Sequence, residues 1–256
     1  MSITVIENKK LDILTENGLF PPSRVMLDLK NLKKVYPTPK GDYTVLEDLN
    51  LQIMKEEFVT IIGHSGCGKT TMLSMIAGLN PISNGNISVL GNHIKGPGPD
   101  RGVIFQSPSL MPWMTSLQNV MLGVNKVFPH ATKAQRNDIA KYYLQKVGIA
   151  RAFAIKPKVL LLDEPFGMLD SLTRGELQDI LIEIWNKEKI TAVMITHDVD
   201  EAIFLADRVV MMTSGPKAKI GDILDINFER PRTRKAVLEH DDYYKYRKHL
   251  IDFLEH

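Results

Sequence analysis

The chain has 256 residues, of which 44% are hydrophobic and 24% are charged, and its formal net charge is +2. It is long enough to bury a sizeable core as one large domain or as a domain with a subdomain, and its near-neutral charge gives no indication of a nucleic-acid partner. The single cysteine excludes a disulfide framework and favours a reducing compartment. No stretch approaches the ~20 consecutive apolar residues of a membrane span, and the first ten residues lack the features of a signal peptide.

The folded part is expected to begin near residue 25. Residues 1–24 close on a Pro-Pro-Ser tripeptide and are predicted to form an N-terminal extension. Residues 26–32 and 44–53 alternate apolar and polar side chains, as half-buried antiparallel strands do, and residues 36–42 between them are expected to turn. Tyr36 therefore lies on a predicted loop, where its ring either stacks on a base or covers the core.

A glycine loop follows the apolar run 58–62. Its spacing is G-x-x-x-x-G-K-[ST], that of a phosphate-binding P-loop, and its residues are Gly63, His64, Ser65, Gly66, Cys67, Gly68, Lys69, Thr70 and Thr71. The glycines allow successive N–H groups to surround phosphate oxygens, and the first turn of the following helix adds unpaired donors and the positive end of its dipole. We expect Lys69 to reach the β- and γ-phosphates and Thr70 to supply a hydroxyl to Mg²⁺.

The middle of the chain is predicted to hold a short strand and two helices. Residues 102–105 form the strand, which ends at Gln106, and helices are expected from Leu117 onward and over 132–153. Before the first helix lies a proline-broken stretch whose large apolar side chains belong either to the core or to a docking surface. They are Met111, Pro112, Trp113 and Met114.

Two continuous apolar runs, 159–162 and 191–196, are typical of strands buried on both faces of a parallel sheet, with a helix over 171–189 between them. Because ligands gather at the carboxyl ends of such strands, we expect the residues that follow them, Asp163, Glu164 and His197, to converge near the glycine loop. Residues 229–256 are basic and then helical. Their predicted apolar packing stripe consists of Tyr244, Leu250, Ile251 and Leu254.

The adjacent carboxylates can divide two tasks. Asp163 can hold Mg²⁺ through water, while Glu164 orients or deprotonates an attacking water. Burying such a pair without a cation would be costly, which favours a functional over a scaffold role. His197 by itself could equally be a structural histidine, but beside these groups it is interpreted as functional.

Over about residues 25–221 the sequence resembles the ATP-binding subunits of ABC transporters. Residues 163–170 look like the Walker B motif with its D-loop, Gln106 like the Q-loop glutamine, residues 195–198 like the switch histidine and Tyr36 like the adenine-stacking aromatic. The resemblance implies an α/β fold: a P-loop NTPase core with a mixed sheet flanked by helices, an antiparallel β subdomain and a shortened helical subdomain. The implied divisions are an extension at 1–24, an ABC ATPase domain at 25–228 with its helical part at about 107–155, and a helical tail at 229–256.

The same resemblance implies ATP and Mg²⁺ as cofactors and a role for each matching residue. Lys69, Thr70 and the loop backbone would bind phosphates, and Asp163 would support Mg²⁺. Glu164 would be the catalytic carboxylate, with Gln106 sensing Mg²⁺ and the attacking water. His197 would hold the γ-phosphate end of the transition state, and Asp170 would be the D-loop contact of a dimer.

Within the family, residues 98–106 and 110–120 are similar to the importer branch for nitrate, sulfonate, taurine and bicarbonate, and residues 230–247 to nitrate and bicarbonate ATPases. The implied function is an ATPase at the cytoplasmic face of the inner membrane that energises uptake of a small anion through an integral membrane permease, supplied by a substrate-binding protein. Nitrate or nitrite is favoured over bicarbonate, cyanate and sulfonate. In such proteins the segment after Gln106 grips the permease, so residues 111–114 are predicted permease contacts.

One family motif is missing. The signature, Leu-Ser-Gly-Gly, is absent from the sequence, Gln106 and Asp163 are only 57 positions apart, and residues 146–152 look like two helix ends joined by a deletion. In ABC dimers each ATP lies between the P-loop of one subunit and the signature of the other, whose donors bind the γ-phosphate. A homodimer would thus have no complete site, whereas a heterodimer with a second, signature-bearing ATPase subunit would have one, and we favour the heterodimer.

Two alternative functions remain open. The chain could be a nucleotide-binding regulatory subunit that is deficient in hydrolysis because the signature is absent. It could also be a soluble ABC ATPase acting on DNA or ribosomes, but such a protein would need coiled-coil inserts or a second cassette, and neither is present in the sequence.

Overall fold

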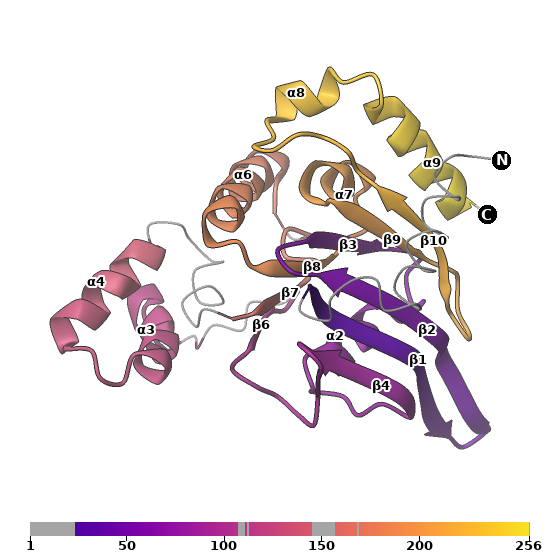
Figure 1. Cartoon of the computed structure of the whole chain (residues 1–256), viewed down its shortest axis with the longest axis horizontal. Helices are drawn as coiled ribbons and strands as arrows, with labels where there is room; N and C mark the ends of the chain where they lie inside the picture. The colour runs from indigo at the N-terminus through magenta and orange to yellow at the C-terminus, as the bar shows by residue number, and fades with distance from the viewer. Residues whose placement is uncertain (1–23, 107–110, 112, 145–156, 168, 256) are drawn as a thin grey trace.

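The computed structural model describes residues 24–106, 111, 113–144, 157–167 and 169–255, and it contains two sheets (Figure 1). The antiparallel sheet has the order β2 (Gly41–Met54), β1 (Val25–Thr38), β4 (Asn84–Val89), β5 (Asn92–His93). The second sheet has the order β10 (Ile220–Asp225), β9 (Arg208–Met212), β3 (Phe58–Ile62), β8 (Thr191–Ile195), β7 (Val159–Asp163), β6 (Arg101–Ile104). Its strands are parallel except for β10, which is antiparallel to β9.

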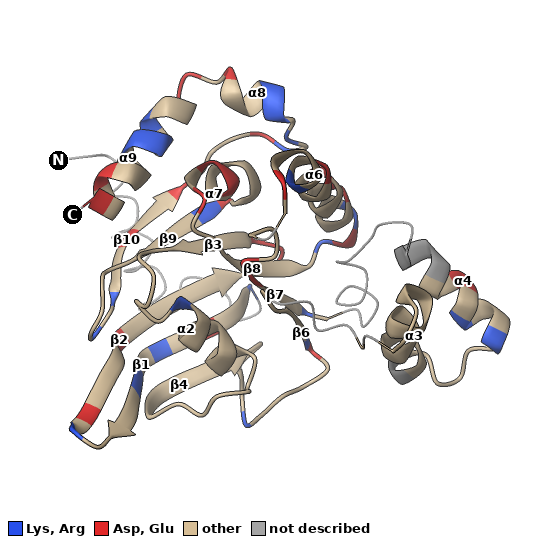
Figure 2. Ribbon diagram, turned by 180° about the vertical axis from the view of Figure 1, so that it is seen from behind, with Lys and Arg blue, Asp and Glu red and all other residues tan. Residues whose placement is uncertain are grey.

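The six-stranded sheet is buried on both faces. On β3, Phe58 and Ile62 belong to one apolar cluster, while Val59 and Ile61 belong to another. Since successive side chains of a strand point to opposite faces, the two clusters lie on the two sides of the sheet. This double burial is the reason that β3, β7 and β8 are continuous apolar runs, and Figure 2 shows β3 and β8 without charged residues.

The helices complete the layers. Helix α2 (Lys69–Ile76) packs in the cluster shared with the antiparallel sheet. Helices α6 (Ser171–Glu188), α7 (Val199–Leu205), α8 (Arg234–Leu238) and α9 (Tyr243–Glu255) contribute to the opposite cluster, and α3 (Ser116–Val127) and α4 (Lys133–Leu144) form a pair beyond β6 (Figure 1). Within the described residues, no helix combines the length and apolar character that a membrane crossing needs.

Most predicted elements of the core are confirmed. The two amino-terminal strands pair in antiparallel fashion, the apolar runs form the parallel strands β7 and β8, and the helix predicted over 171–189 is α6. The helix predicted over 132–153 is present as α4 up to Leu144, and residues 145–153 lie outside the described residues.

Two local predictions are wrong. Tyr36 lies on β1 opposite Tyr43, not on a loop, because β1 continues to Thr38 and the chain turns only at residues 39–40. The pairing of β1 with β4 ends at Lys33, so Pro37, which lacks an N–H group, lies where one side of the strand is open. In α9 the inward tyrosine is Tyr243, which is buried, whereas Tyr244 is 71% exposed and therefore not part of the packing stripe.

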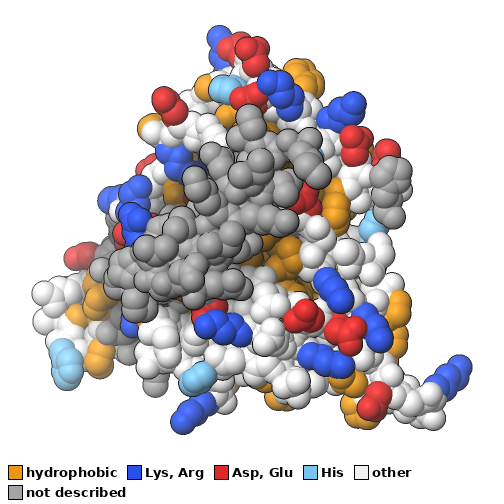
Figure 3. Space-filling view, turned by 45° about the vertical axis from the view of Figure 1, so that its right-hand side comes forward, with side chains coloured by type: hydrophobic (Ala, Val, Ile, Leu, Met, Phe, Trp, Pro, Cys, Tyr) orange, Lys and Arg blue, Asp and Glu red, His pale blue; other side chains and the backbone are white. Residues whose placement is uncertain are grey.

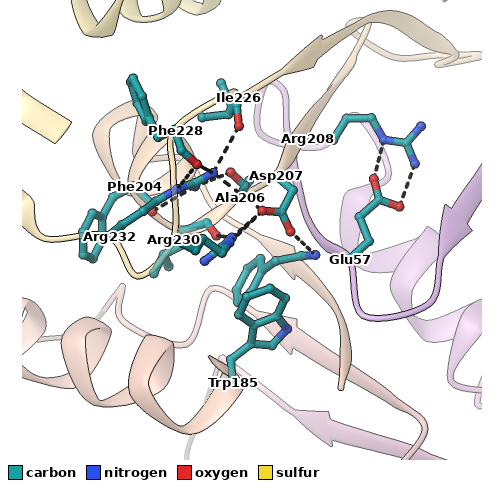
Figure 4. A network of polar contacts seen from close by, with 12 residues as sticks. Glu57, Trp185, Phe204, Ala206, Asp207, Arg208, Ile226, Phe228, Arg230 and Arg232 are labelled. Atoms are coloured by element: carbon teal, nitrogen blue, oxygen red, sulfur yellow. Dashed lines mark hydrogen bonds and ion pairs between the residues drawn. The ribbon is translucent and has the colours of Figure 1, made fainter. Parts of the chain in front are cut away.

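The C-terminal segment is anchored by a buried guanidinium group (Figure 4). Arg232, whose side chain is 1% exposed, donates hydrogen bonds to the carbonyl oxygens of Phe204, Ala206, Ile226 and Phe228. Burial, assisted by the neighbouring charge of Arg230, lowers the pKa of Arg232 to about 10. Arg230 itself stacks on Trp185, with 4.1 Å from its guanidinium carbon to the ring centroid. Residues 229–232 are therefore an integral part of the packed domain.

Candidate functional site

The glycine loop joins β3 to α2 in the predicted order of strand, loop and helix. Gly68 is the N-cap of α2 with φ +100°, and a Cβ atom at this position would lie 2.8 Å from side-chain atoms of Val45 and Leu46, so only glycine fits. Among the described residues, no side chain caps the start of α2. Its first backbone N–H groups and the positive end of its dipole are consequently available to an anion.

Lys69 is folded back over this loop. Its Nζ donates to the carbonyl oxygens of Gly63 at 2.7 Å and His64 at 2.9 Å, and the residue is 7% exposed. The thiol of Cys67 is buried beside it, with Sγ 3.9 Å from Nζ. The carbonyl groups of the loop thus hold the Lys69 ammonium group close to the start of α2, where it could contact a bound phosphate.

The remaining loop residues lie at the surface or at its edge. His64, Ser65 and Gly66 are exposed, and Thr71 is half-buried. Gly66 has φ +80° and open space around the position of a Cβ atom. These residues form the rim of the loop.

Thr70 and Asp163 meet across the gap between α2 and β7. The Thr70 hydroxyl donates to Asp163 Oδ1 at 3.1 Å. Burial raises the pKa of Asp163, and it outweighs the opposing effects of the Thr70 hydrogen bond and the Lys69 charge. A carboxylate that is desolvated in this way is stabilised in its ionised form by a bound cation.

Two side chains that follow parallel strands converge on one carboxylate oxygen of Glu164, which follows the strand between them. Gln106, after β6, donates to Glu164 Oε2 at 3.0 Å, and Nδ1 of His197, after β8, lies 3.5 Å from the same oxygen. Glu164, after β7, has φ +45°, a conformation that side chains other than glycine rarely adopt and that is concentrated at functional sites. The predicted convergence at the carboxyl ends of the strands is therefore confirmed.

Tyr36 lies beside the segment that follows α2. Its hydroxyl accepts a hydrogen bond from Asn80 Nδ2 at 2.6 Å, and the Lys34 ammonium lies over one face of its ring, 4.6 Å from the centroid. Asp170 is the N-cap of α6, where its carboxylate accepts from the backbone N–H groups of Leu172 and Thr173 and its pKa is lowered by these bonds.

The segment from Met111 to Thr115 is fixed by hydrogen bonds to one buried side-chain amide, that of Asn119. Asn119 accepts from the Met111 N–H group and donates to the carbonyl oxygens of Met111, Met114 and Thr115. Trp113 is 75% exposed, and Pro112 lies outside the described residues. This part of the segment presents an aromatic ring to the surroundings on a fixed backbone.

Two polar residues that line a cavity with Glu164 and His197 belong to no sequence motif, and the sequence does not predict them as site residues. Arg174 lies one turn into α6 and bonds to Asp198, and Glu201 on α7 is buried and accepts from Gln178. Their only sequence signal is a charge on a helix, and this signal is the same for solvent-exposed positions.

Glu201 should make stability depend on pH. Burial, which outweighs the hydrogen bonds to Thr196 and Gln178, raises its pKa above the ordinary value of 4.5. The native state keeps a proton that the unfolded chain releases, so this residue's contribution to stability decreases as the pH rises from 4.5 through the raised pKa. Glu201→Gln cannot lose a proton, and we expect the variant to be more stable than the wild type at pH 8, with a smaller advantage at pH 5.

Urea unfolding at both pH values measures this difference. Glu176→Gln, on the exposed side of α6, is the matched control and should follow the wild type. If Glu201→Gln and the wild type show the same change in unfolding free energy between the two pH values, the assignment of a retained proton to Glu201 is wrong.

The chain resembles known proteins in sequence and in structure. The family described as ABC transporter matches residues 46–167. The chain is 49% identical over 249 residues to the bicarbonate transport ATP-binding protein CmpD of Synechocystis sp., covering 89% of this chain and 88% of CmpD. It is 45% identical over 242 residues to the nitrate import ATP-binding protein NrtD of Synechococcus elongatus, covering 86% of this chain and 88% of NrtD.

The structure is similar to the dimeric structure of MJ0796, a bacterial ABC transporter cassette, with a TM-score of 0.72 and 27% identity over 80% of this chain and 100% of that one. This similarity confirms the predicted α/β P-loop fold with its mixed and antiparallel sheets. Together with the glycine loop and the groups gathered around Glu164, these relationships show that the chain belongs to the ABC transporter family, as one of its ATP-binding subunits.

Proposed function

We propose that this ATPase subunit binds ATP and Mg²⁺ at the glycine loop, hydrolyses ATP with Glu164 as the catalytic carboxylate, and thereby energises import of a small anion through a separate membrane permease. The observation that carries the proposal is the meeting of Gln106 and His197 at Glu164 Oε2, beside the Thr70–Asp163 pair. A neutral donor and an imidazole on one carboxylate oxygen can orient that carboxylate toward a water molecule.

The residues fit Mg²⁺ in the manner in which phosphate-transfer sites hold it. Among the described residues there is no group of three or more His, Cys, Asp or Glu side chains that could hold a metal ion. Mg²⁺ commonly uses one or two protein oxygens, waters and the substrate phosphates instead, and the Thr70 hydroxyl and the desolvated Asp163 carboxylate supply such oxygens. When bound, the ion would neutralise charge on the β- and γ-phosphates.

The chain's own groups then have separate tasks. Lys69 and the N–H groups at the start of α2 bind the phosphates, and Glu164 accepts a proton from the attacking water. Gln106 holds the Glu164 carboxylate in place, and His197, whose side chain is 61% exposed, is accessible to the γ-phosphate. Tyr36 is proposed to stack on the adenine with the ring face that Lys34 does not cover.

The transported ion is proposed from the relatives. CmpD is named for bicarbonate and NrtD for nitrate, and identities of 49% and 45% do not separate the two. Nitrate, which the sequence resemblance favours, and bicarbonate are therefore the two ions to test by uptake of isotope-labelled substrate in the assembled transporter. The exposed Trp113 with Met111, Pro112 and Met114 is the proposed permease contact, at the cytoplasmic face of the membrane.

We further propose that the second ATPase subunit of the complex carries the signature that this sequence lacks. The comparison with CmpD supports a deletion, because its 249 aligned positions include only 89% of this chain, or about 228 residues, so about 20 positions of the alignment face a gap in this chain. The complete catalytic site would consist of this chain's P-loop, Asp163, Glu164 and His197 with the partner's signature donors. Hydrogen-bond donors of this kind are worth ~10²–10³-fold in rate.

ATPase measurements with and without the partner subunit test this arrangement. We expect the purified chain alone to hydrolyse ATP at least ~10-fold more slowly than the complex with a signature-bearing subunit and the permease. An intact mass of 28.9 kDa for the purified chain verifies that the signature is missing from the protein that is assayed. Brisk hydrolysis by the isolated chain would contradict the heterodimer, and a lack of hydrolysis in the full complex would contradict the catalytic assignment.

A further inference from the structure

We propose that Arg174 is a positioning residue for ATP hydrolysis, because its guanidinium group ties the loop that carries Glu164 to the loop that carries His197. This inference rests on the proposed function and adds a residue to it. Arg174 Nη1 donates to Asp198 Oδ2 at 3.2 Å, and Nη2 donates to the Leu169 carbonyl oxygen at 3.2 Å. One planar group thus joins the end of the loop after β7 to the residue that follows His197.

Both attachment points are themselves fixed. The Asp198 carboxylate accepts from the N–H groups of Asp200 and Glu201 as the N-cap of α7, and the Asp198 N–H group donates to the Thr196 hydroxyl at 3.0 Å. The Leu169 N–H group donates to the Phe166 carbonyl oxygen at 3.1 Å. A shift of the guanidinium group would therefore be transmitted to the backbone on both sides of the Glu164–His197 pair.

The same side chain lines the space between the two loops. The cavity there has a volume of about 10 Å³, and its lining includes Glu164, Arg174, His197 and Asp198. This volume is close to the minimum that holds one water molecule, so the loops are packed against each other and Arg174 forms part of the wall. Truncation of Arg174 would enlarge this space and release both loops.

The bond pattern requires arginine. A guanidinium group presents donors in a fixed fork that reaches a carboxylate and a carbonyl oxygen at the same time, whereas a lysine ammonium is a single point of charge. The Arg174–Asp198 pair is about one-third exposed on each side, and pairs of this exposure contribute little to folding stability. We therefore expect substitutions at Arg174 to affect the rate of hydrolysis more than stability.

The test measures ATP hydrolysis by the complete transporter with Arg174→Ala and Arg174→Lys. A catalytic geometry displaced by about 1 Å can cost ~10²-fold in rate, so we expect kcat to decrease at least ~10-fold in both variants, with less than ~2-fold change in KM for ATP. The melting temperature should remain close to that of the wild type. The control is Arg247→Ala. This variant removes the ion pair of Arg247 with Asp200, which lies in the first turn of α7, and it should leave kcat unchanged.

Asp198→Asn supplies an independent variant, since it removes the charge but keeps an oxygen to cap α7. If Arg174 acts through Asp198, the double variant Arg174→Ala/Asp198→Asn should lose no more activity than Arg174→Ala alone. Full activity of Arg174→Ala, an equal loss in Arg247→Ala, or additive losses in the double variant would overturn the inference. If the wild-type complex itself does not hydrolyse ATP, the proposed function fails; if it does and Arg174→Ala matches it, only this inference fails.

Discussion

Replacing Glu164 with glutamine should lower the rate of ATP hydrolysis in the complete complex by at least ~10²-fold, the usual contribution of a positioned general base. Glutamine keeps the size of the side chain and an oxygen that can accept from Gln106, but it cannot take a proton from water. The phosphate-binding groups, among them Lys69 and the start of α2, are unchanged, so ATP should remain bound. Single-turnover hydrolysis and retention of radiolabelled ATP after rapid gel filtration measure the two effects.

The matched control for this experiment is Glu176→Gln, which makes the same chemical change at an exposed position of α6. It should hydrolyse ATP as the wild type does. Wild-type turnover by Glu164→Gln would remove the carboxylate from the mechanism. A loss of ATP binding together with hydrolysis would show that Glu164 acts in binding and not in the chemical step.

Replacing Arg232 with methionine should destabilise the protein by at least about 3 kcal/mol. The side chain donates to four backbone carbonyl oxygens, and each buried polar group that is left without a partner costs ~1–3 kcal/mol. Removal of the charge also removes its desolvation cost, which is evident in the lowered pKa, but this gain is smaller than the loss of several carbonyl partners. Urea unfolding monitored by circular dichroism measures the difference.

Two further variants separate charge from hydrogen bonding at this site. Arg232→Lys retains the charge but has fewer donors, so its stability should lie between those of the wild type and Arg232→Met. Lys235→Met makes a similar exchange on α8 at a side chain that is 82% exposed, and it should unfold like the wild type. A loss of less than about 1 kcal/mol in the free energy of unfolding of Arg232→Met would be close to the effect of an ordinary surface substitution. It would mean that this residue does not anchor the C-terminal segment.

The central sheet and the arrangement of the candidate site could be predicted because their signals are local. A strand buried on both faces is a continuous apolar run, the glycine loop has a fixed spacing, and the rule for the carboxyl ends of parallel strands places Asp163, Glu164 and His197 together. The structure adds that Gln106 and His197 share one oxygen of Glu164. This detail depends on the register of β7 with its neighbours β6 and β8, which no local sequence pattern encodes.

Other features could not be read from local patterns, because partners distant in sequence determine them. The prolines at 37 and 39 favour a loop at Tyr36, but the pairing of β1 with β2 continues through Pro37 to Thr38. The apolar pattern predicts Tyr244 in the packing stripe of α9, but the structure buries the neighbouring Tyr243, whose hydroxyl donates to Asp200. Arginine is usually found at the surface, so the sequence does not single out Arg174 and Arg232. Only the tertiary fold shows the carbonyl groups to which they donate.

Charge on the outside of the molecule gives little guidance to the partners. Basic and acidic side chains are interspersed on the face seen in Figure 3, in keeping with the net charge of +2. Recognition of the permease is therefore expected to depend on apolar side chains such as Trp113, and less on a field of one sign.

The position of Cys67 makes the chain suited to site-specific labelling. It is the single cysteine of the sequence, and it is 1% exposed within the glycine loop. A thiol introduced at the exposed Ser116, three residues after Trp113 in the chain, would be the one that maleimide dyes reach in the folded chain, with no need to remove the native cysteine from the glycine loop. Fluorescence from that position would report the proposed docking to the permease while the candidate site keeps all of its own residues.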